Sequence, residues 1–227
     1  MANRGEKQFI RMPKFAVRLY DGMMKKKPLI QQRVEIAQEL LKYINKGKLL
    51  DVGTGHGRLL LELSNMNEDI QLFGLDISEK MIELAKKNLS RFSIELKCGN
   101  ITEAPYEDNF FNIVTCTGSF YLWDDPVKAL NEIYRILISK GKFILFETHN
   151  EFDIKKLQSL VKQNLKDESF ISRKTIPNFL YKQIRMTYEI SEIENLIGNS
   201  QFRDNFTLEK ITLANLPIWL KIEISKE

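Results

Sequence analysis

Hydrophobic and polar residues follow two different periods along this chain, and the change from one period to the other marks its secondary-structure elements. Short apolar runs bounded by Gly, Asn, Asp or Lys are typical of buried β-strands. Five such runs occupy the middle of the chain, and two more lie near its end. The predicted strands are 48–52, 71–76, 93–98, 111–116, 142–147, 206–214 and 218–224.

Between these runs, apolar residues recur every three or four positions, as on the buried face of an amphipathic helix. The predicted helices are 28–44, a helix beginning at 58–64, 78–89, 126–137, 154–165 and 191–197. Asp125 suits the N-cap of the fourth helix and Pro126 its first turn, and Gly141 is expected to end it in a left-handed conformation. Ser191 and Glu194 match a capping box.

Strands and helices alternate through the middle of the chain, which indicates an α/β fold built on a parallel sheet. The last two strands flank the sequence "NLP" and predict an antiparallel hairpin, which extends the sheet to seven strands. Residues 167–188 have no clean period and are interpreted as a lid or cap. The chain is therefore expected to be mostly parallel α/β with an antiparallel C-terminal edge.

Composition narrows the class of protein. The chain has 227 residues, of which 43% are hydrophobic and 28% charged, so we expect one soluble globular domain. No apolar run is long enough to span a membrane and no secretory signal is seen. Cys98 and Cys116 are too few for a disulfide scaffold or a zinc site, which favours the cytoplasm and no metal. A net charge of +4 permits an anionic partner without requiring nucleic acid.

The stretch "LLDVGTGHG" places three glycines between a strand and a helix. Gly53, Gly55 and Gly57 leave backbone bare, and the following helix N-terminus presents free N–H groups, so a ligand with a carboxylate or phosphate fits there. The spacing is not that of a dinucleotide fingerprint, whose third glycine would stand at Arg58, and it lacks the Lys and Ser or Thr of a P-loop.

Asp76 ends the second strand, roughly 20 residues after the glycines, where an acid can accept both ribose hydroxyls. The alternative is an N-cap for the next helix, but Ser78 is the better cap. The glycine loop and Asp76 together indicate an adenosine-type ligand.

These motifs resemble those of the class I S-adenosylmethionine (SAM)-dependent methyltransferases, in particular the small-molecule enzymes of ubiquinone and menaquinone biosynthesis. The resembling stretches are "LLDVGTGHG", "GLDISEKMIELAKKNL", "CGNITEAPYEDNFFNIV" and "LWDDPVKALNEIYRILISKGKFIL". The resemblance implies a three-layer Rossmann-like sandwich. It divides the single domain 1–227 into an N-terminal helical cap (1–46), a cofactor-binding core (47–150), a helical lid (151–190) and the last helix with the hairpin (191–227).

The resemblance also implies roles for individual residues. The cofactor-binding residues would be Tyr20, Asp51, Gly53, Thr54, Gly55, Asp76, Ile77, Met81, Asn100, Ile101 and Thr117. Asp51 would hold the methionine amino group and Asp76 the ribose, whereas Tyr20 would either close over the cofactor or serve only in packing. Asn100 stands where the family usually has aspartate, and its amide can still bind adenine. His56 is interpreted as loop-exposed and not catalytic.

The expected reaction is in-line transfer of a methyl group from SAM to an O, N, S or C nucleophile of a small molecule, leaving S-adenosylhomocysteine. No general base is evident; weak candidates are Tyr121, Glu147 and His149, at the ends of two strands, each of which could be a rim residue. The alternatives are an RNA or protein methyltransferase, or an inactive cofactor-binding partner subunit. The acceptor and the oligomeric state are not readable from the sequence.

Overall fold

A seven-stranded sheet forms the centre of the molecule. The computed structural model describes the backbone of residues 14–227 and the side chains from residue 19 onward, so the first part of the predicted N-terminal cap lies outside the described residues. The strands are β1 (Gly47–Val52), β2 (Ile70–Asp76), β3 (Glu95–Cys98), β4 (Phe111–Thr117), β5 (Leu137–Thr148), β6 (Phe206–Leu213) and β7 (Leu216–Ser225). Their order is β3-β2-β1-β4-β5-β7-β6.

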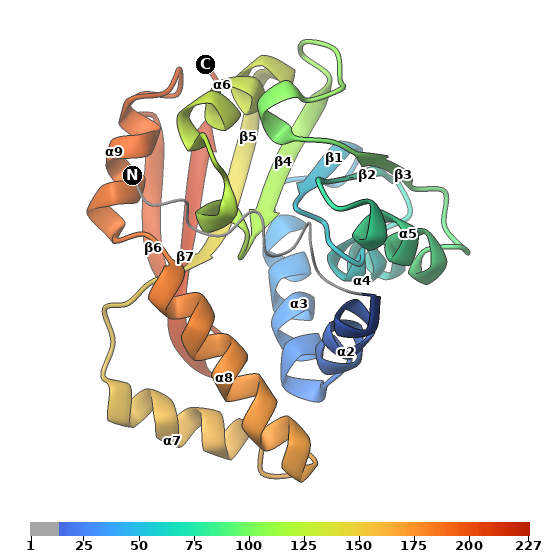
Figure 1. Ribbon diagram of the computed structural model, residues 1–227. Coiled ribbons are helices and arrows are strands. Elements are labelled where there is room, and N and C mark those ends of the chain that lie inside the picture. Colours follow the sequence, from blue (N-terminus) through green and yellow to red (C-terminus); the bar gives the residue numbers. More distant parts are fainter. Residues whose placement is uncertain (1–13) are drawn as a thin grey trace.

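The pairing of the strands confirms the predicted fold class. Strands β1 to β5 are mutually parallel, and β7 runs antiparallel between β5 and β6. Residues 214 and 215 between β6 and β7 both have positive φ, as a tight hairpin turn requires. The C-terminal hairpin therefore forms one edge of the sheet (Figure 1).

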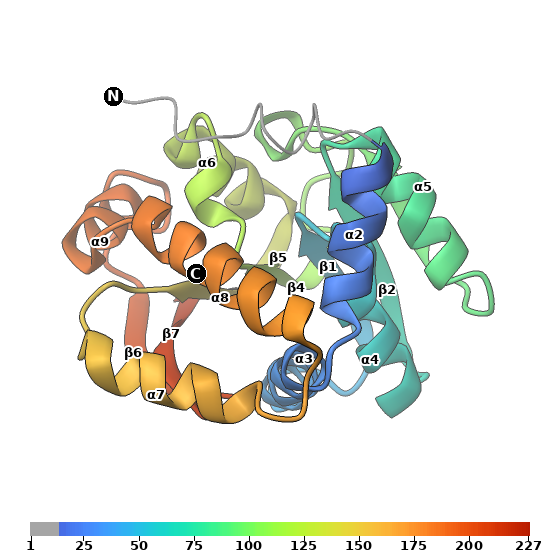
Figure 2. The same ribbon diagram turned by 60° about the horizontal axis from the view of Figure 1, so that its bottom comes forward.

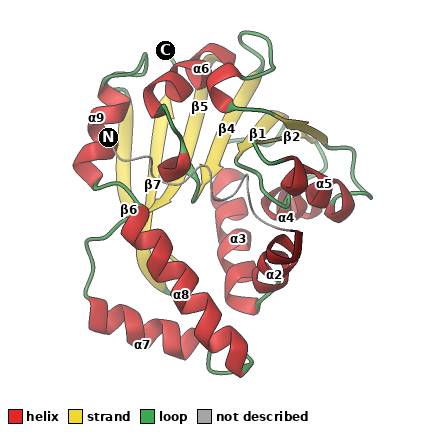
Figure 3. Ribbon diagram, viewed as in Figure 1, coloured by secondary structure: helices red, strands yellow, loops and turns green. Residues whose placement is uncertain are grey.

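Helices cover both faces of the sheet and give three layers (Figure 3). The helices are α2 (Lys14–Met24), α3 (Lys27–Leu40), α4 (Arg58–Met66), α5 (Glu79–Asn88), α6 (Pro126–Ile136), α7 (Ile154–Asn164), α8 (Phe170–Met186) and α9 (Ile190–Gly198). Side chains of α3, α4, α5 and α7 share one apolar cluster with the sheet, and those of α6 and α9 share the other.

Strand β5 illustrates why its sequence is a continuous apolar run. Successive side chains of a strand point to opposite faces. Phe143 and Leu145 enter the cluster beneath α6 and α9, whereas Ile144 and Phe146 enter the cluster beneath α3 and α7. All four are fully buried because both faces of this central strand are covered.

Helices α7 and α8 lie beyond one end of the sheet (Figure 1), and α8 passes across the ends of the central strands (Figure 2). This is the carboxyl end of the parallel strands, because Gly118, directly after β4, lies against Gln183 of α8. The segment without a clean period is thus a helix of 17 residues that contains Pro177. Its periodicity is weak because α8 buries only Ser172, Ile176 and Ile184 completely.

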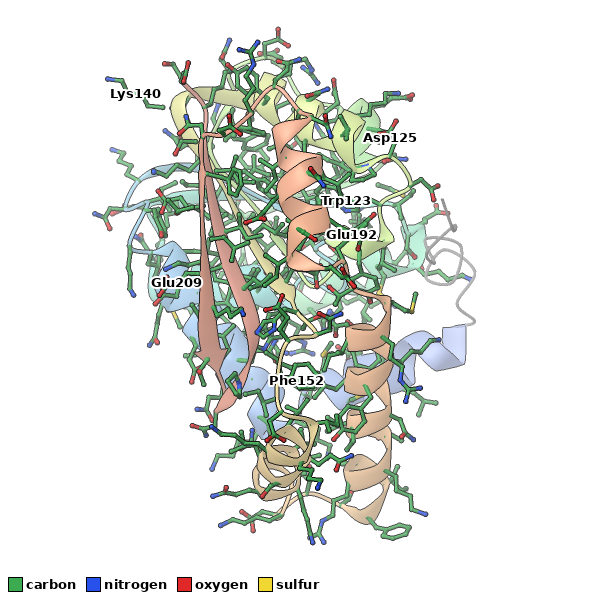
Figure 4. The ribbon with its side chains drawn as sticks, turned by 90° about the vertical axis from the view of Figure 1, so that its left-hand side faces the viewer. Trp123, Asp125, Lys140, Phe152, Glu192 and Glu209 are labelled. Carbon is green, nitrogen blue, oxygen red and sulfur yellow. The ribbon has the colours of Figure 1, made fainter. Side chains whose placement is uncertain are left out.

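Two predicted element boundaries are wrong. The left-handed residue after α6 is Lys140 (φ +63°), and Gly141 does not have positive φ. Lys140 projects at the end of the molecule away from Phe152 and the hairpin of α7 and α8 (Figure 4). The capping box of α9 is formed by Glu189 and Glu192, two residues before the predicted pair, and in it the Glu189 N–H donates to the Glu192 carboxylate.

Candidate functional site

The site lies where the strand order reverses. β1 leads to β2 on one side and β4 leads to β5 on the other, so the loops after β1 and β4 diverge and leave a crevice. The glycine loop follows β1 and is tied to β2, because the Gly53 N–H donates to the Leu75 carbonyl at 2.8 Å. The topology therefore places the predicted ligand loop at the switch point of the sheet.

The three glycines have positive φ, but each is needed for a different reason. A Cβ on Gly53 would collide with the Ser119 hydroxyl, and a Cβ on Gly57 would lie 2.6 Å from Leu89 Cδ1. A Cβ on Gly55 would meet nothing closer than the Gly53 carbonyl, at 4.0 Å. Gly53 and Gly57 are thus required by packing, whereas Gly55 leaves room above the loop that a ligand can fill.

Asp76 is fixed in place by two backbone groups. Its Oδ2 accepts from the Gly55 N–H and its Oδ1 from the Ser78 N–H, both at 2.8 Å. Burial raises the pKa of this carboxyl, and the two hydrogen bonds partly oppose that effect. Ser78 occupies the N-cap position of α5, as expected, although its side chain makes no capping hydrogen bond, and Asp76 lines the cavity between the glycine loop and α5.

Asp51 lies deeper, at the end of β1, and is almost fully buried. Burial raises the pKa of Asp51 to about 7, the Thr54 hydroxyl opposes this shift, and the Asp76 charge adds to it. Two acids so close together favour a cationic ligand group, because a nearby positive charge restores the ionised form. Thr117 Oγ1, at the end of β4, is also buried and has no hydrogen-bond partner among the described residues.

A cavity of about 240 Å³ joins these groups. It is lined by all eleven residues predicted to bind the cofactor: Tyr20, Asp51, Gly53, Thr54, Gly55, Asp76, Ile77, Met81, Asn100, Ile101 and Thr117. At the end of the cavity beside α5, Met81 and Ile101 are buried, and the Asn100 side chain accepts from the Thr102 N–H. All eleven residues therefore border the same cavity, while the role assigned to each of them stays a prediction.

The other end of the cavity is apolar and lies beneath α7 and α8. Its walls there are Val161, Leu165, Ile176, Phe179, Leu180, Leu216 and Trp219. Gln183 also lines it and lies over Gly118, where its amide would be 2.9 Å from a Cβ on that glycine. The cavity therefore has a polar half at the glycine loop and an apolar half under the helical hairpin.

The interpretation of His56 as loop-exposed is wrong. Its side chain is buried, lines the cavity and packs at a tilt of 60° against Tyr20, with ring centroids 5.4 Å apart. Tyr20 in turn lies 5.6 Å from the ring of Phe179, so α2, the glycine loop and α8 meet here. Burial, with Arg33 and Arg58 nearby, lowers the pKa of His56 to about 3, so the imidazole is neutral.

Arg33 is a candidate site residue that the sequence analysis missed. It lies on α3, lines the cavity and is more than nine-tenths buried. Its guanidinium donates to the Met24 carbonyl at 2.7 Å, its Nε has no partner, and no described carboxylate lies within ion-pair distance. Glu62 and Asp21 act on Arg33 only from beyond ion-pair distance, so this buried cation beside an open cavity fits a ligand carboxylate. The available signal was a lone arginine on the apolar stripe of a predicted amphipathic helix.

The three candidate bases occupy different environments. Tyr121 lines the cavity, whereas Glu147 and His149 do not. Glu147 is fully buried, and its carboxylate accepts from the Thr148 N–H at 2.9 Å. Burial raises the pKa of Glu147 to about 7, against hydrogen bonds from the backbone of residues 120, 121 and 148. Burial and the Glu147 charge raise the pKa of Tyr121, which keeps its hydroxyl protonated.

The residues present fit SAM. At Gly55 the backbone is open to a ligand, and nearby the Asp76 carboxylate is held by hydrogen bonds. Asp51 and Arg33, which forms no ion pair among the described residues, border the same cavity. Such a set matches a ribose, an ammonium and a carboxylate on one ligand. Within the described residues no group of three or more His, Cys, Asp or Glu is arranged to hold a metal ion. None of the described helices has the length and apolarity needed to cross a bilayer.

Comparison with known proteins points to the same chemistry. A family model described as "Methyltransferase domain" matches residues 50–145. The methyltransferase YdaC of Bacillus subtilis is 29% identical over 52% of this chain and 67% of its own. The demethylmenaquinone methyltransferase of Thermotoga maritima is 29% identical over 59% of this chain, and that of Bacillus mycoides 35% identical over 44%. These matches span 62% and 44% of the two relatives' lengths.

Solved structures establish the fold over nearly the whole chain. A SAM-dependent methyltransferase from Methanococcus maripaludis superposes with a TM-score of 0.71 at 23% identity, covering 94% of this chain and 93% of that one. The plantazolicin methyltransferase BpumL, in complex with SAH, gives a TM-score of 0.70 at 14% identity, covering 99% and 95%. The Rossmann-like sandwich and its C-terminal hairpin are thus shared with methyltransferases of known structure.

Proposed function

We propose that this chain, a class I SAM-dependent methyltransferase, transfers the methyl group of SAM to a small, largely apolar molecule. The observation that carries the proposal is the single cavity with two unlike halves. Its polar half is bordered by Asp51, Gly55, Asp76 and Arg33, and its apolar half by α7 and α8. Because α8 passes over the strand ends, the acceptor half is covered, which favours a small molecule over an RNA or protein chain.

The chain's own residues would position SAM and exclude water. Asp76 would accept from the ribose hydroxyls, Asp51 would pair with the ammonium, and Arg33 would pair with the carboxylate. When bound, SAM supplies an electrophilic methyl group on a sulfonium and leaves as a neutral thioether. Such a leaving group needs little help, so alignment and desolvation are the main contributions required of the protein.

Asp51 has a pKa of about 7 but would be paired with the ammonium of SAM, and neither Tyr121 nor His56, which also line the cavity, is matched to proton transfer at neutral pH. The pKa of Tyr121 is raised, and that of His56 is lowered to about 3, whereas an effective general base titrates near the working pH. We therefore favour an acceptor that brings its own nucleophile, such as an ionisable aromatic hydroxyl, a thiol or an amine. The similarity to demethylmenaquinone methyltransferases makes hydroxylated aromatic rings, and their ring carbons, the first acceptors to try.

Calorimetric titration with SAM tests the cofactor half. We expect binding by the parent chain and at least roughly tenfold weaker binding by Asp76→Ala, because two hydrogen bonds to the ribose are lost. Methyl transfer is then measured with SAM labelled in its methyl group against a panel of phenols, quinols, thiols and amines. SAM binding without transfer to any acceptor, RNA included, would favour an inactive partner subunit; no binding by folded protein would refute the proposal.

A further inference from the structure

The hairpin formed by α7 and α8, residues 154–186, has a second, outward surface that the cavity does not use. Two large apolar side chains stand at the start of α8 on this surface: Phe170 is 71% exposed and Ile171 is 72% exposed. They are adjacent in sequence and lie at the tip of the hairpin, where the connection from α7 enters α8. Adjacent, largely exposed Phe and Ile side chains cost free energy and mark interaction sites when charges surround them.

The same hairpin concentrates positive charge. Between residues 154 and 186 it contains Lys155, Lys156, Lys162, Lys166, Arg173, Lys174, Lys182 and Arg185. It contains only two acids, Asp167 and Glu168, and Glu168 is paired with Lys26 at 3.1 Å. The hairpin thus carries more positive charge than the net +4 of the whole chain, and the remainder of the chain is net negative.

The charges and the apolar tip share one side of α8. Ile171, Lys174, Lys182 and Arg185 are all exposed and recur at helical spacing, so they form a stripe opposite the face that lines the cavity. Lys174 lies over the Phe170 ring, 4.7 Å from its centroid, which places a cation directly beside the apolar tip. A basic stripe beside an exposed apolar pair at the tip of a helix is suited to the surface of an anionic bilayer, where the cations meet the headgroups and only the apolar tip enters the boundary below them.

We propose that the outer face of this hairpin docks on the surface of a lipid bilayer that contains anionic lipids. Basic residues near an anionic bilayer are attracted by its surface potential, and Phe170 and Ile171 would enter the acyl boundary. Nucleic acid would match the charge but offers no apolar environment for Ile171, and a protein partner would have to supply an apolar groove as well as carboxylates, whereas an anionic bilayer supplies both. The hairpin projects from the end of the molecule (Figures 1 and 2), so no other described element covers this surface.

The docking would bring the cavity to the membrane, because the opposite face of the same hairpin forms the apolar half of the cavity. An acceptor dissolved in the bilayer would then lie one helix away from the methyl donor. The docking surface does not include the residues proposed to bind SAM, so vesicle binding and methyl transfer are separate properties and can fail separately.

Vesicle co-sedimentation of the full chain tests the proposal. We expect binding to vesicles of phosphatidylcholine mixed with phosphatidylglycerol, and at least roughly tenfold weaker binding to vesicles of phosphatidylcholine alone or at high salt. The double variant Phe170→Ser/Ile171→Ser and the variant Lys174→Glu should each weaken binding to the anionic vesicles severalfold. Their melting temperatures and SAM affinities should equal those of the parent chain, since all three residues are exposed and outside the cavity.

Matched controls separate this surface from general charge or stickiness. Lys140→Glu makes the same charge change at the opposite end of the molecule, and Met66→Ser removes an apolar side chain that is 38% exposed on α4. Both should bind vesicles like the parent chain. The proposal is overturned if the full chain does not bind anionic vesicles, or if control and hairpin variants lose binding equally. It is also overturned if only RNA retains the chain, or if Phe170 instead mediates self-association.

Discussion

The substitution Gly55→Ala should separate cofactor binding from folding. Gly55 has φ +54°, and a Cβ there would meet no atom closer than the Gly53 carbonyl at 4.0 Å. The fold therefore bears only the left-handed strain, about 1–2 kcal/mol, or a fall of about 2–8 °C in melting temperature for a chain of this length. The added methyl group stands in the cavity where the ligand must approach the backbone, so we expect SAM affinity to fall at least roughly tenfold, about 1.4 kcal/mol.

Gly57→Ala provides the matched control in the same loop. Gly57 has φ +74°, and its Cβ would lie 2.6 Å from Leu89 Cδ1, but Gly57 does not line the cavity. The strain is the same, and overpacking against Leu89 adds about 1–3 kcal/mol. We therefore expect a larger loss of stability than for Gly55→Ala, with the SAM affinity of the folded protein nearly unchanged.

Thermal unfolding followed by circular dichroism gives the stabilities, and calorimetric titration with SAM, at a temperature where all three proteins are folded, gives the affinities. The expected result is an inversion: the less destabilised variant binds worse. The reasoning is refuted if Gly55→Ala binds SAM like the parent chain, or if Gly57→Ala loses more affinity than Gly55→Ala.

Three further predictions concern charged residues. Arg33→Met should weaken SAM binding roughly tenfold, measured by calorimetry, because it removes a charge-assisted hydrogen bond to the ligand. It should not lower the melting temperature, because it also removes a desolvated cation from the fold. Asp51→Asn should weaken SAM binding by a similar factor, and an unchanged affinity would refute the pairing of Asp51 with the ammonium. The same variant should stabilise the ligand-free protein at about pH 8, where the buried Asp51 carboxylate is ionised. Glu147 has a folded-state pKa of about 7, above its ordinary value of 4.5, so the stability that its protonated form contributes is lost as pH rises through 7. The free energy of unfolding should therefore fall between about pH 5 and pH 8, and Glu147→Gln should remove up to about 3 kcal/mol of this fall. Urea titration at the two pH values measures it.

The order of elements and the central motifs could be predicted from the sequence because both depend on local patterns. Alternating strands and helices select a parallel α/β sheet, and the "NLP" turn selects the edge hairpin, which together account for seven strands. Gly53, Gly55 and Asp76 follow the ends of β1 and β2, and the carboxyl ends of neighbouring parallel strands meet at one edge. That these residues border one cavity could therefore be predicted from the order of the strands, without knowing how side chains pack.

Other features depend on contacts between segments far apart in sequence. Residues 167–188 show no helical period because α8 packs over strand ends and a cavity, where no continuous apolar stripe is needed. His56 was expected to be exposed, but α2 and α8 cover it through Tyr20 and Phe179. Tyr121 follows β4 and Glu147 lies near the end of β5, yet only Tyr121 faces the cavity, because the β5 pleat turns Glu147 into the interior.

The sequence by itself thus determined the sheet, the glycine loop and the polar half of the site, since short-range periodicity and turn chemistry encode them. Only the tertiary structure decided which buried groups are left without partners and which helix face remains outside. Arg33 became a candidate ligand residue because it forms no ion pair with a described carboxylate and its Nε has no partner. Phe170 and Ile171 became a candidate surface because no described residue covers them. Partnership and exposure are properties of the whole packed chain, because the neighbours that would supply them come from distant segments.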